Sequence, residues 1–282
     1  MLISTQLLGA LCALASAGLW GGGDFAGGFA TRRNSQFQVL ALASFSGLVV
    51  LVGGALVRHE ALLSPRGMLW AMAAGLAGAV GTAALYRALS LGHAASIAPT
   101  AAVVGAGLPV AFSIFTEGWP GPTRLAGFAL ALAGIWLVSQ TSASGRGVPR
   151  RGLALAVLAG TGFAGFFILI AQVEPGPLFM PLAVVRSVSL GTALLLLLVY
   201  RPPAASTGAS WAALLAGFVD VWGNVTYLLA KQFTRMDAAT VLGSLYPAAT
   251  VLLARLVLKE AVSRTQWLGV GLCLAAIALI TV

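Results

Sequence analysis

The sequence predicts an all-α, polytopic membrane protein with ten transmembrane helices, arranged as an inverted repeat of five plus five. Of its 282 residues, 59% are hydrophobic and 8% are charged, which is more apolar side chain than a water-soluble fold of this size can bury. Apolar runs of about 20 residues, the length that crosses a bilayer core, follow one another along the chain. Stretches 86–140 and 227–282, which end the two halves, resemble each other.

The repeat is clearest in the last two spans of each half. Setting Glu117 on Glu260 brings Gly127 opposite Gly269, with a difference of one residue in the loop between them. Both acidic residues end an apolar run at the expected membrane edge. We therefore expect them to anchor loops, with Arg124 or Arg264 as a nearby partner, and a direct role in substrate binding is the alternative.

The boundary between the two copies is a polar stretch rich in Ser, Gly and Arg, residues 141–151. Residues 15–21 resemble residues 159–165, which supports the same division. We therefore divide the chain into a first five-helix repeat (1–140), a linker loop (141–151) and a second, inverted five-helix repeat (152–282).

Ten apolar segments are expected to form helices, because in lipid the backbone must satisfy its own hydrogen bonds. They are 7–30, 36–57, 67–89, 96–116, 122–140, 152–173, 177–199, 208–230, 237–258 and 265–282. Pro99 and Pro109 in the fourth segment and Pro247 in the ninth predict kinks. An odd number of spans per half inserts the second copy upside down. Inverted repeats of this kind are a recurring plan of secondary transporters, which hold substrate between the halves near mid-membrane.

Three charged residues lie inside predicted spans, where a charge costs roughly 2.5–3.5 kcal/mol on insertion scales. They are Asp24, Arg186 and Asp220. Arg186 and Asp220 either pair with each other to fix helix packing or face a substrate. Asp24 has no basic residue near it in its own span, which favours a functional role. The alternative for Asp24 is a place near the end of its span, in interfacial water beside Arg32 and Arg33.

Helical spacing groups these charges with other polar and aromatic residues. Trp20 and Asp24 are four residues apart and share a face. Asp220, Asn224 and Tyr227 share one face of the eighth span. If these faces line a cavity, a carboxylate there can take up a proton as substrate leaves, and so couple transport to a proton gradient.

The candidate substrate-binding residues combine these charges with aromatic side chains that can stack on a flat or cationic group. They are Trp20, Asp24, Tyr86, Arg186, Asp220, Asn224, Tyr227 and Tyr246. A substrate that carries both charges, such as an amino acid, would suit the combination of an Asp with an Arg.

Several of these motifs resemble those of a known family. They are the Trp20-Gly21 pair, the run that starts at Tyr86, the segment from Tyr246 to Glu260, and the Gly-rich last span of each half. Together they resemble EamA-type proteins of the drug/metabolite transporter superfamily over essentially the whole chain. The resemblance implies ten helices, a central cavity, and export or exchange of small metabolites such as amino acids without ATP.

Motifs of several other function classes are missing from the sequence. Neither Lys231 nor Lys259 follows a glycine loop of the kind that binds ATP, and there is no HExxH or GxSxG motif. Cys12 and Cys273 are too few for a metal site or a disulfide framework. The net charge of +9 reflects arginines that flank the membrane rather than a nucleic-acid surface. We therefore expect no enzyme activity, no cofactor, no metal and no nucleic-acid partner.

The leading interpretation is a secondary transporter that exports or exchanges a small organic metabolite by alternating access, with or without proton coupling. Spans one, three, four, six, eight and nine are the expected lining of its cavity. The alternative is a non-transporting membrane scaffold or lipid-binding protein. This alternative predicts no accessible cavity and a fully paired Arg186–Asp220.

The expected location is the cell (plasma or inner) membrane, with the chain crossing it many times as a monomer or homodimer. The expected partners are the lipid bilayer, a small-molecule substrate and protons. Five basic residues flank the spans on the side that carries both termini, against eight on the other side. By the positive-inside rule this places the termini outside.

Overall fold

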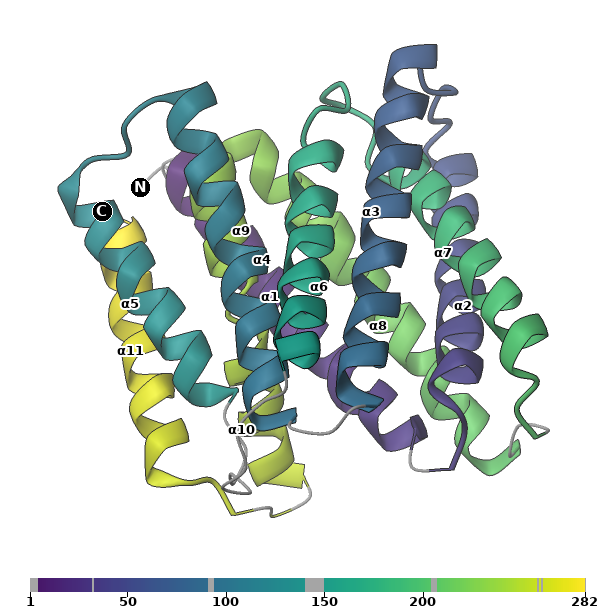
Figure 1. Cartoon of the computed structure of the whole chain (residues 1–282). Coiled ribbons are helices and arrows are strands. Elements are labelled where there is room, and N and C mark those ends of the chain that lie inside the picture. Colours follow the sequence, from purple (N-terminus) through teal and green to yellow (C-terminus); the bar gives the residue numbers. More distant parts are fainter. Residues whose placement is uncertain are drawn as a thin grey trace.

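The computed structural model consists of helices joined by loops (Figure 1). It describes residues 5–31, 33–90, 94–139, 150–203, 207–257, 259 and 261–281, and these ranges contain no strand. The helices are α1 (Thr5–Thr31), α2 (Gln36–Val57), α3 (Pro65–Ser90), α4 (Ala94–Glu117), α5 (Pro122–Val138), α6 (Arg150–Ile170), α7 (Phe179–Tyr200), α8 (Thr207–Phe233), α9 (Met236–Gly243), α10 (Tyr246–Val257) and α11 (Arg264–Thr281). The all-α prediction is confirmed for the described residues.

The helix bounds agree with the predicted spans to within three residues, with one correction. The ninth span, predicted as one helix over 237–258, is divided: α9 ends at Gly243 and α10 begins at Tyr246. Pro247 lies in the first turn of α10, where its missing N–H is tolerated. In a continuous helix the carbonyl of Gly243 would have no hydrogen-bond donor at position 247, because proline has no backbone N–H. By contrast, α4 continues past Pro109.

Eight helical segments in the described part of the chain are long and apolar enough to cross a membrane, with α9 and α10 counted as one. The chain is therefore a multi-pass membrane protein. The apolar helix α5 has only 17 residues, and α1, with 27 residues, is not one of these eight segments. Of the predicted linker, Arg150 and Arg151 open α6, and the rest lies outside the described residues, as does Glu260.

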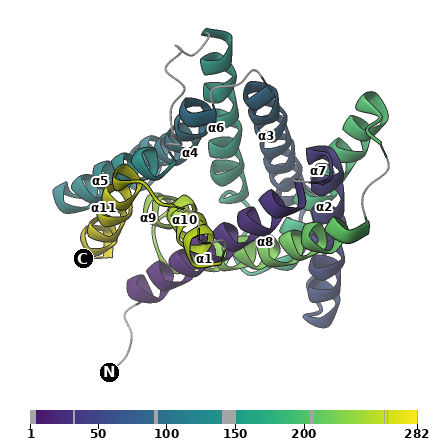
Figure 2. The same cartoon turned by 90° about the horizontal axis from the view of Figure 1, so that it is seen from below.

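The helices form two layers that face each other, as Figure 2 shows along the bundle. On one side lie α3, α4 and α6, and on the other lie α1, α8 and α10. At one edge α5 packs on α11, and at the opposite edge α2 packs on α7. Within the layers, α1 packs on α8 and α3 packs on α6. Both chain ends lie on the same side of the bundle, at the upper left in Figure 1.

Glycine allows two of these helix pairs to approach closely. Between α3 and α6, a Cβ on Gly162 would lie 2.5 Å from the Cα of Gly81. Between α5 and α11, a Cβ on Gly134 would lie 2.7 Å from Cys273 Sγ, and one on Gly269 would lie 2.9 Å from the carbonyl oxygen of Gly134. No other residue fits at these distances. Close packing of this kind holds helices together in lipid, where they gain nothing from leaving water.

The loop between α2 and α3 is tied to the second half of the chain at the upper end of the bundle in Figure 1. The carboxylate of Glu60 accepts the backbone N–H groups of residues 178–180 at 2.8–3.0 Å. These amides belong to the start of α7, where the helix dipole favours a negative charge. In the same loop Ser64 donates to Glu174, and this hydrogen bond lowers the pKa of the Glu174 carboxyl.

The end of α4 is tied to the start of α9 at the same end of the bundle. Glu117 Oε2 accepts the backbone N–H of Met236 at 3.1 Å and lies 3.8 Å from Arg235 Nε. Glu117 therefore anchors a loop, as expected, but the loop belongs to the other half of the chain. Arg124, the expected partner, donates instead to Gln6.

Arg235 makes further hydrogen bonds between the end of α4 and the start of α9. It donates to the carbonyl oxygens of Glu117 at 2.9 Å and Gly118 at 2.6 Å, and to the carboxylate of Asp237 at 2.9 Å. Asp237 is fully buried, so the guanidinium neutralises a charge that water cannot reach. The hydrogen bond to Asp237 raises the pKa of the Arg235 guanidinium.

Candidate functional site

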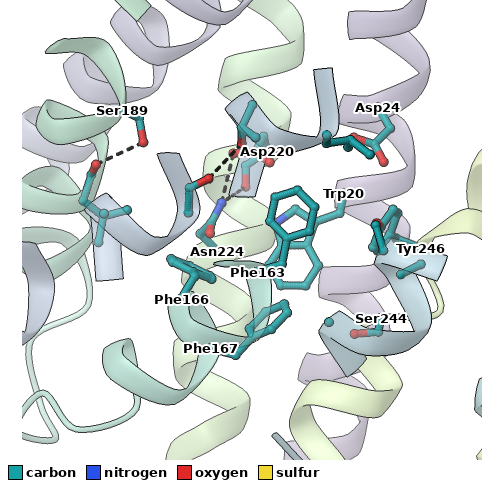
Figure 3. A pocket seen from close by; sticks show the side chains of 18 of the residues that line it. Trp20, Asp24, Phe163, Phe166, Phe167, Ser189, Asp220, Asn224, Ser244 and Tyr246 are labelled. Atoms are coloured by element: carbon teal, nitrogen blue, oxygen red, sulfur yellow. Dashed lines mark hydrogen bonds between the residues drawn. The ribbon is translucent and has the colours of Figure 1, made fainter. Parts of the chain in front are cut away.

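A cavity of about 440 Å³ lies between the two helix layers (Figure 3). Its walls come from α1, α2, α3, α4, α6, α7, α8, α10 and the break between α9 and α10. The lining residues are Trp20, Asp24, Leu40, Gly75, Gly78, Thr82, Leu85, Ala101, Ala102, Gly105, Phe163, Phe166, Phe167, Val185, Arg186, Ser189, Asp220, Asn224, Ser244 and Tyr246. The volume falls in the range of sites that hold small organic molecules.

Most of the candidate residues from the sequence meet in this cavity. Those that line it are Trp20, Asp24, Arg186, Asp220, Asn224 and Tyr246. Tyr227 does not line it, because it is fully buried behind Trp20, with the two ring centroids 5.8 Å apart. Tyr86 belongs to α3, and its side chain lies outside the described part of the structure.

Asp220 is the centre of a polar network on the cavity wall. Arg186 of α7 forms an ion pair with its carboxylate. Asn224, one turn later on α8, donates to Asp220 Oδ2 at 2.9 Å and to its backbone oxygen at 2.8 Å. The exposed fractions of the side chains are 15% for Arg186 and 36% for Asp220, so the pair faces the cavity. Both alternatives from the sequence therefore hold in part: the pair forms, and it lines the candidate site.

The scaffold alternative predicts a fully paired Arg186–Asp220 and no accessible cavity. The pair is present, but the cavity is present as well. The geometry of this wall therefore agrees better with a binding site than with a sealed scaffold.

Asp24 shares the cavity but does not join the network. Its side chain is exposed and makes no hydrogen bond or ion pair with any described residue. Helix α1 approaches α8 closely here, because a Cβ on Gly23 would lie 3.4 Å from Asp220 Cβ. In Figure 3 Asp24 lies on the side of Trp20 and Tyr246, away from the dashed bonds around Asp220. The interfacial alternative for Asp24 does not match this inward position.

An aromatic cluster centred on Trp20 forms one wall of the cavity. The ring of Trp20 lies 5.8 Å from those of Phe167 and Tyr227 and 6.5 Å from that of Tyr246. Gly223 leaves the space for the indole, since a Cβ there would lie 2.5 Å from Trp20 Cδ1. The position of Trp20 is therefore set by its neighbours on α6, α8 and α10.

Tyr227 supports this cluster from behind. Its hydroxyl lies 3.0 Å from Thr240 Oγ1 of α9, and both residues are fully buried. Without this hydrogen bond the Tyr227 hydroxyl would be buried in the core with no hydrogen-bond partner. Tyr227 thus shapes the cavity wall, whereas the spacing in the sequence predicted that it faces the cavity.

The break between α9 and α10 opens onto the cavity through Ser244 and Tyr246. Across the break, the N–H of Ser244 donates to the carbonyl of Thr240 at 2.8 Å and that of Ala248 to Leu245 at 3.0 Å. Irregular backbone at membrane depth is tolerated where it lines a cavity.

Reasoning from the sequence missed most of the apolar lining. Phe163, Phe166 and Phe167 of α6 line the cavity, and so do Leu40 of α2 and Ser189 of α7. Helices α2 and α7 were not among the expected lining spans. The three phenylalanines do share a helical face, but a stripe of aromatic residues at this spacing is also what ordinary helix packing produces.

The cavity can hold a small molecule that is polar at one end and apolar at the other. Among the described residues it offers an ion pair, a carboxylate without a partner and the Asn224 amide beside aromatic rings. Among the described residues no group of three His, Cys, Asp or Glu side chains could hold a metal ion.

Solved structures include a protein with the same fold. Of the solved structures, 28 chains match, and one crystal structure of a protein aligns with a TM-score of 0.77. The alignment covers 96% of this chain and 95% of the other, at 22% sequence identity. A likeness at this identity establishes the shared fold alone. A search of curated proteins gave no match.

The family comparison covers both halves of the chain. Residues 7–140 and residues 150–282 each match the model of the EamA-like transporter family. The two matched segments together include almost the whole chain, which agrees with the resemblance in the sequence. This chain belongs to the EamA-like transporter family.

Proposed function

We propose that the protein is a ten-helix secondary transporter that exports or exchanges a small organic metabolite by alternating access. The observation that carries the proposal is the cavity of about 440 Å³ between the helix layers. Its walls present an ion pair, a carboxylate with no partner in the described part of the chain, and aromatic rings, and an interrupted helix lines it. Secondary transporters hold substrate near mid-membrane in sites built from interrupted helices.

The helix contacts support an inverted repeat of five plus five, with α1 and α5 also crossing the membrane. In such a repeat α6, α7, α8, α9–α10 and α11 correspond to α1, α2, α3, α4 and α5. Exchanging the halves turns the α1–α8 contact into α6–α3, α2–α8 into α7–α3, and α4–α6 into α9–α1, and each of these contacts exists. The α2–α7, α5–α11 and α4–α9 contacts map onto themselves. We retain the repeat boundaries at 1–140 and 152–282.

Alternating access requires one end of the cavity to open while the other closes. The ties made by Glu60 and Glu117 join the halves at one end, and both ties use carboxylates of the first half and backbone amides of the second. In the proposed cycle these hydrogen bonds break when that end opens. Interfaces that switch between two packed arrangements are the usual basis of such transitions.

Proton coupling is proposed to use Asp24. It is the unpaired charged side chain among the described lining residues, and the titratable side chains around it are Asp220 on α8 and Tyr246 on α10. A proton on Asp24 would remove an uncompensated charge from a space of low dielectric. Binding of a proton and binding of substrate would then compete at one site.

The test is a metabolite screen on proteoliposomes that contain the full-length protein. The proposal expects release of at least one class of small organic solute, and a dependence of that release on a pH gradient that Asp24→Asn removes. Arg33→Gln, which removes an exposed charge outside the cavity and away from the contacts between the halves, is the control and should transport normally. Release that ignores both the gradient and Asp24→Asn would contradict proton coupling. Folded protein that moves no solute at all would contradict transport.

The proposed location is the plasma or inner membrane, with the protein as a monomer or homodimer. Fractionation of cells that express the tagged chain tests the location. Recovery of the protein in another membrane would overturn it.

A further inference from the structure

We infer that the transported metabolite is an organic amine, a cation on an apolar or aromatic body, rather than a zwitterion or an anion. This inference rests on the proposed function and names the substrate class of the same cavity. It differs from the expectation that an amino acid would engage Asp and Arg together. The difference comes from which charges the structure pairs.

Arg186, the cationic side chain among the described lining residues, is already in an ion pair. Arg186 pairs with Asp220, and Asn224 donates a further hydrogen bond to the same carboxylate. A substrate carboxylate would have to displace Asp220 from Arg186. The displaced carboxylate would then be left with only the Asn224 amide in a region of low dielectric, which costs free energy.

One of the two anionic side chains that line the described part of the cavity, Asp24, is available to a ligand. Asp24 has no hydrogen bond or ion pair to a described residue and is exposed to the cavity. Among the described lining residues, one cation and two anions leave a net charge of minus one when all three are ionised. A cavity with uncompensated negative charge attracts a cation and repels an anion.

The surroundings of Asp24 suit an ammonium group with an apolar body. Trp20 is one helical turn before it on α1, and Tyr246 lies beside it on α10, so aromatic faces are close to the carboxylate (Figure 3). Aromatic faces attract ammonium ions. The wall of α6 adds the rings of Phe163 and Phe166, against which an apolar or aromatic body can pack.

The experiment compares three ligands that share one phenyl body but differ in charge. Binding of 2-phenylethylamine, phenylalanine and 3-phenylpropionate to the purified full-length protein is measured by titration calorimetry. We expect the amine to bind on the order of tenfold more tightly than either carboxylate-bearing ligand. The reason is the charge-assisted hydrogen bond that its ammonium group can donate to the Asp24 carboxylate. Asp24→Asn should remove this preference, Asp24→Glu should keep part of it, and Arg33→Gln should not change it.

A second variant tests the assignment of the paired charges. Asp220→Asn frees Arg186, so binding of 3-phenylpropionate should increase while binding of the amine decreases. Equal or tighter binding of phenylalanine or 3-phenylpropionate to the unmodified protein overturns the inference. So does binding of the amine that Asp24→Asn leaves unchanged, or the absence of amine binding.

The outcome is separable from that of the transport proposal. If the amine fails to bind but proteoliposomes still release another class of solute, the substrate class is wrong and transport stands. If folded protein releases no solute in the broad screen, both proposals fail together.

Discussion

Arg186 of α7 and Asp220 of α8 form an ion pair that lines the central cavity instead of being sealed between helices. The two residues are 34 positions apart in the chain, and the exposed fractions of their side chains are 15% and 36%. The pair is therefore both a helix contact and part of the candidate site. Its partial exposure also decides how much stability it can contribute.

Breaking this pair from either side should destabilise the protein moderately. Arg186→Gln leaves the Asp220 carboxylate with Asn224 alone, and Asp220→Asn leaves the guanidinium unpaired. We expect each change to cost about 1–3 kcal/mol, below the value for a fully sealed pair, because both side chains reach the cavity. The measurement is chemical or thermal unfolding of the purified protein, followed by tryptophan fluorescence.

The double variant Arg186→Gln/Asp220→Asn is the control for this prediction. It should be more stable than the sum of the single changes implies, by about 1 kcal/mol, because it leaves no unpaired charge. Strictly additive losses would mean that the pair contributes nothing to folding.

A methyl group at Gly223 should disturb the cavity wall. The added Cβ would lie 2.5 Å from Trp20 Cδ1, so Gly223→Ala must displace the indole from its place against Phe167 and Tyr246. We expect a loss of stability of about 1–3 kcal/mol, the usual cost of overpacking, together with weakened ligand binding. Both are measured on the same preparation.

Gly18→Ala on α1 is the matched control for Gly223→Ala. Nothing lies within 4 Å of a Cβ built at position 18. This change should be neutral or stabilise the helix by up to about 1 kcal/mol. Equal losses in both variants would mean that the effect comes from glycine replacement in general and not from Trp20.

Removing Glu60 should loosen the start of α7. Glu60→Ala deletes the acceptor of three consecutive backbone amides, residues 178–180, and the negative charge at the positive end of the helix. We expect a loss of about 1–2 kcal/mol and faster hydrogen exchange of these amides. Glu60→Gln, which keeps an acceptor but not the charge, should fall between. Unchanged exchange in Glu60→Ala would show that other groups hold the start of α7.

Replacing Arg235 should have a larger effect than replacing any exposed arginine. Its side chain is the partner of the fully buried Asp237, and it also binds the carbonyls of Glu117 and Gly118. Arg235→Gln leaves a buried carboxylate without a counter-ion, which we expect to cost about 3–5 kcal/mol. Arg124→Gln, at an exposed hydrogen bond to Gln6, should change stability by no more than about 0.5 kcal/mol. Similar unfolding temperatures for the two variants would contradict the role of Arg235.

Loss of the hydrogen bond between Tyr227 and Thr240 should depend on which partner is removed. Thr240→Val leaves the phenol hydroxyl buried without a partner and should cost about 1–3 kcal/mol. Tyr227→Phe leaves the smaller Thr240 hydroxyl, which can bond to a nearby helix carbonyl, and should cost less. Unfolding of the two single variants and the double variant checks this order. A costlier Tyr227→Phe would mean that Thr240 has no alternative acceptor.

Most of the fold could be predicted because lipid leaves few alternatives. Apolar runs of spanning length must form helices, and the helix bounds agree with the predicted spans to within three residues. The division of the ninth span was predicted only as a kink at Pro247. Whether a proline bends a helix or interrupts it depends on what the freed backbone groups can contact, and here they line a cavity.

The candidate site was predictable in its charged residues and not in its apolar ones. A charge inside a membrane span needs a functional or structural reason, which singled out Asp24, Arg186 and Asp220. The phenylalanines of α6 carry no such signal, because an aromatic side chain is equally stable against lipid, against another helix or against a cavity. Tyr227 shares a face with Asp220, yet it is buried where α9 covers it.

The sequence by itself determined that the chain is a membrane protein of two similar halves, because hydrophobicity, span length and internal repetition are properties of the chain. Only the tertiary structure decided which charges neutralise each other and which stay available. Pairing depends on the distance between helices, so the sequence offered the Arg186–Asp220 pair as one of two alternatives and did not show whether it forms. The Arg186–Asp220 pair leaves Asp24 without a partner among the described residues, and the proposed substrate class follows from it.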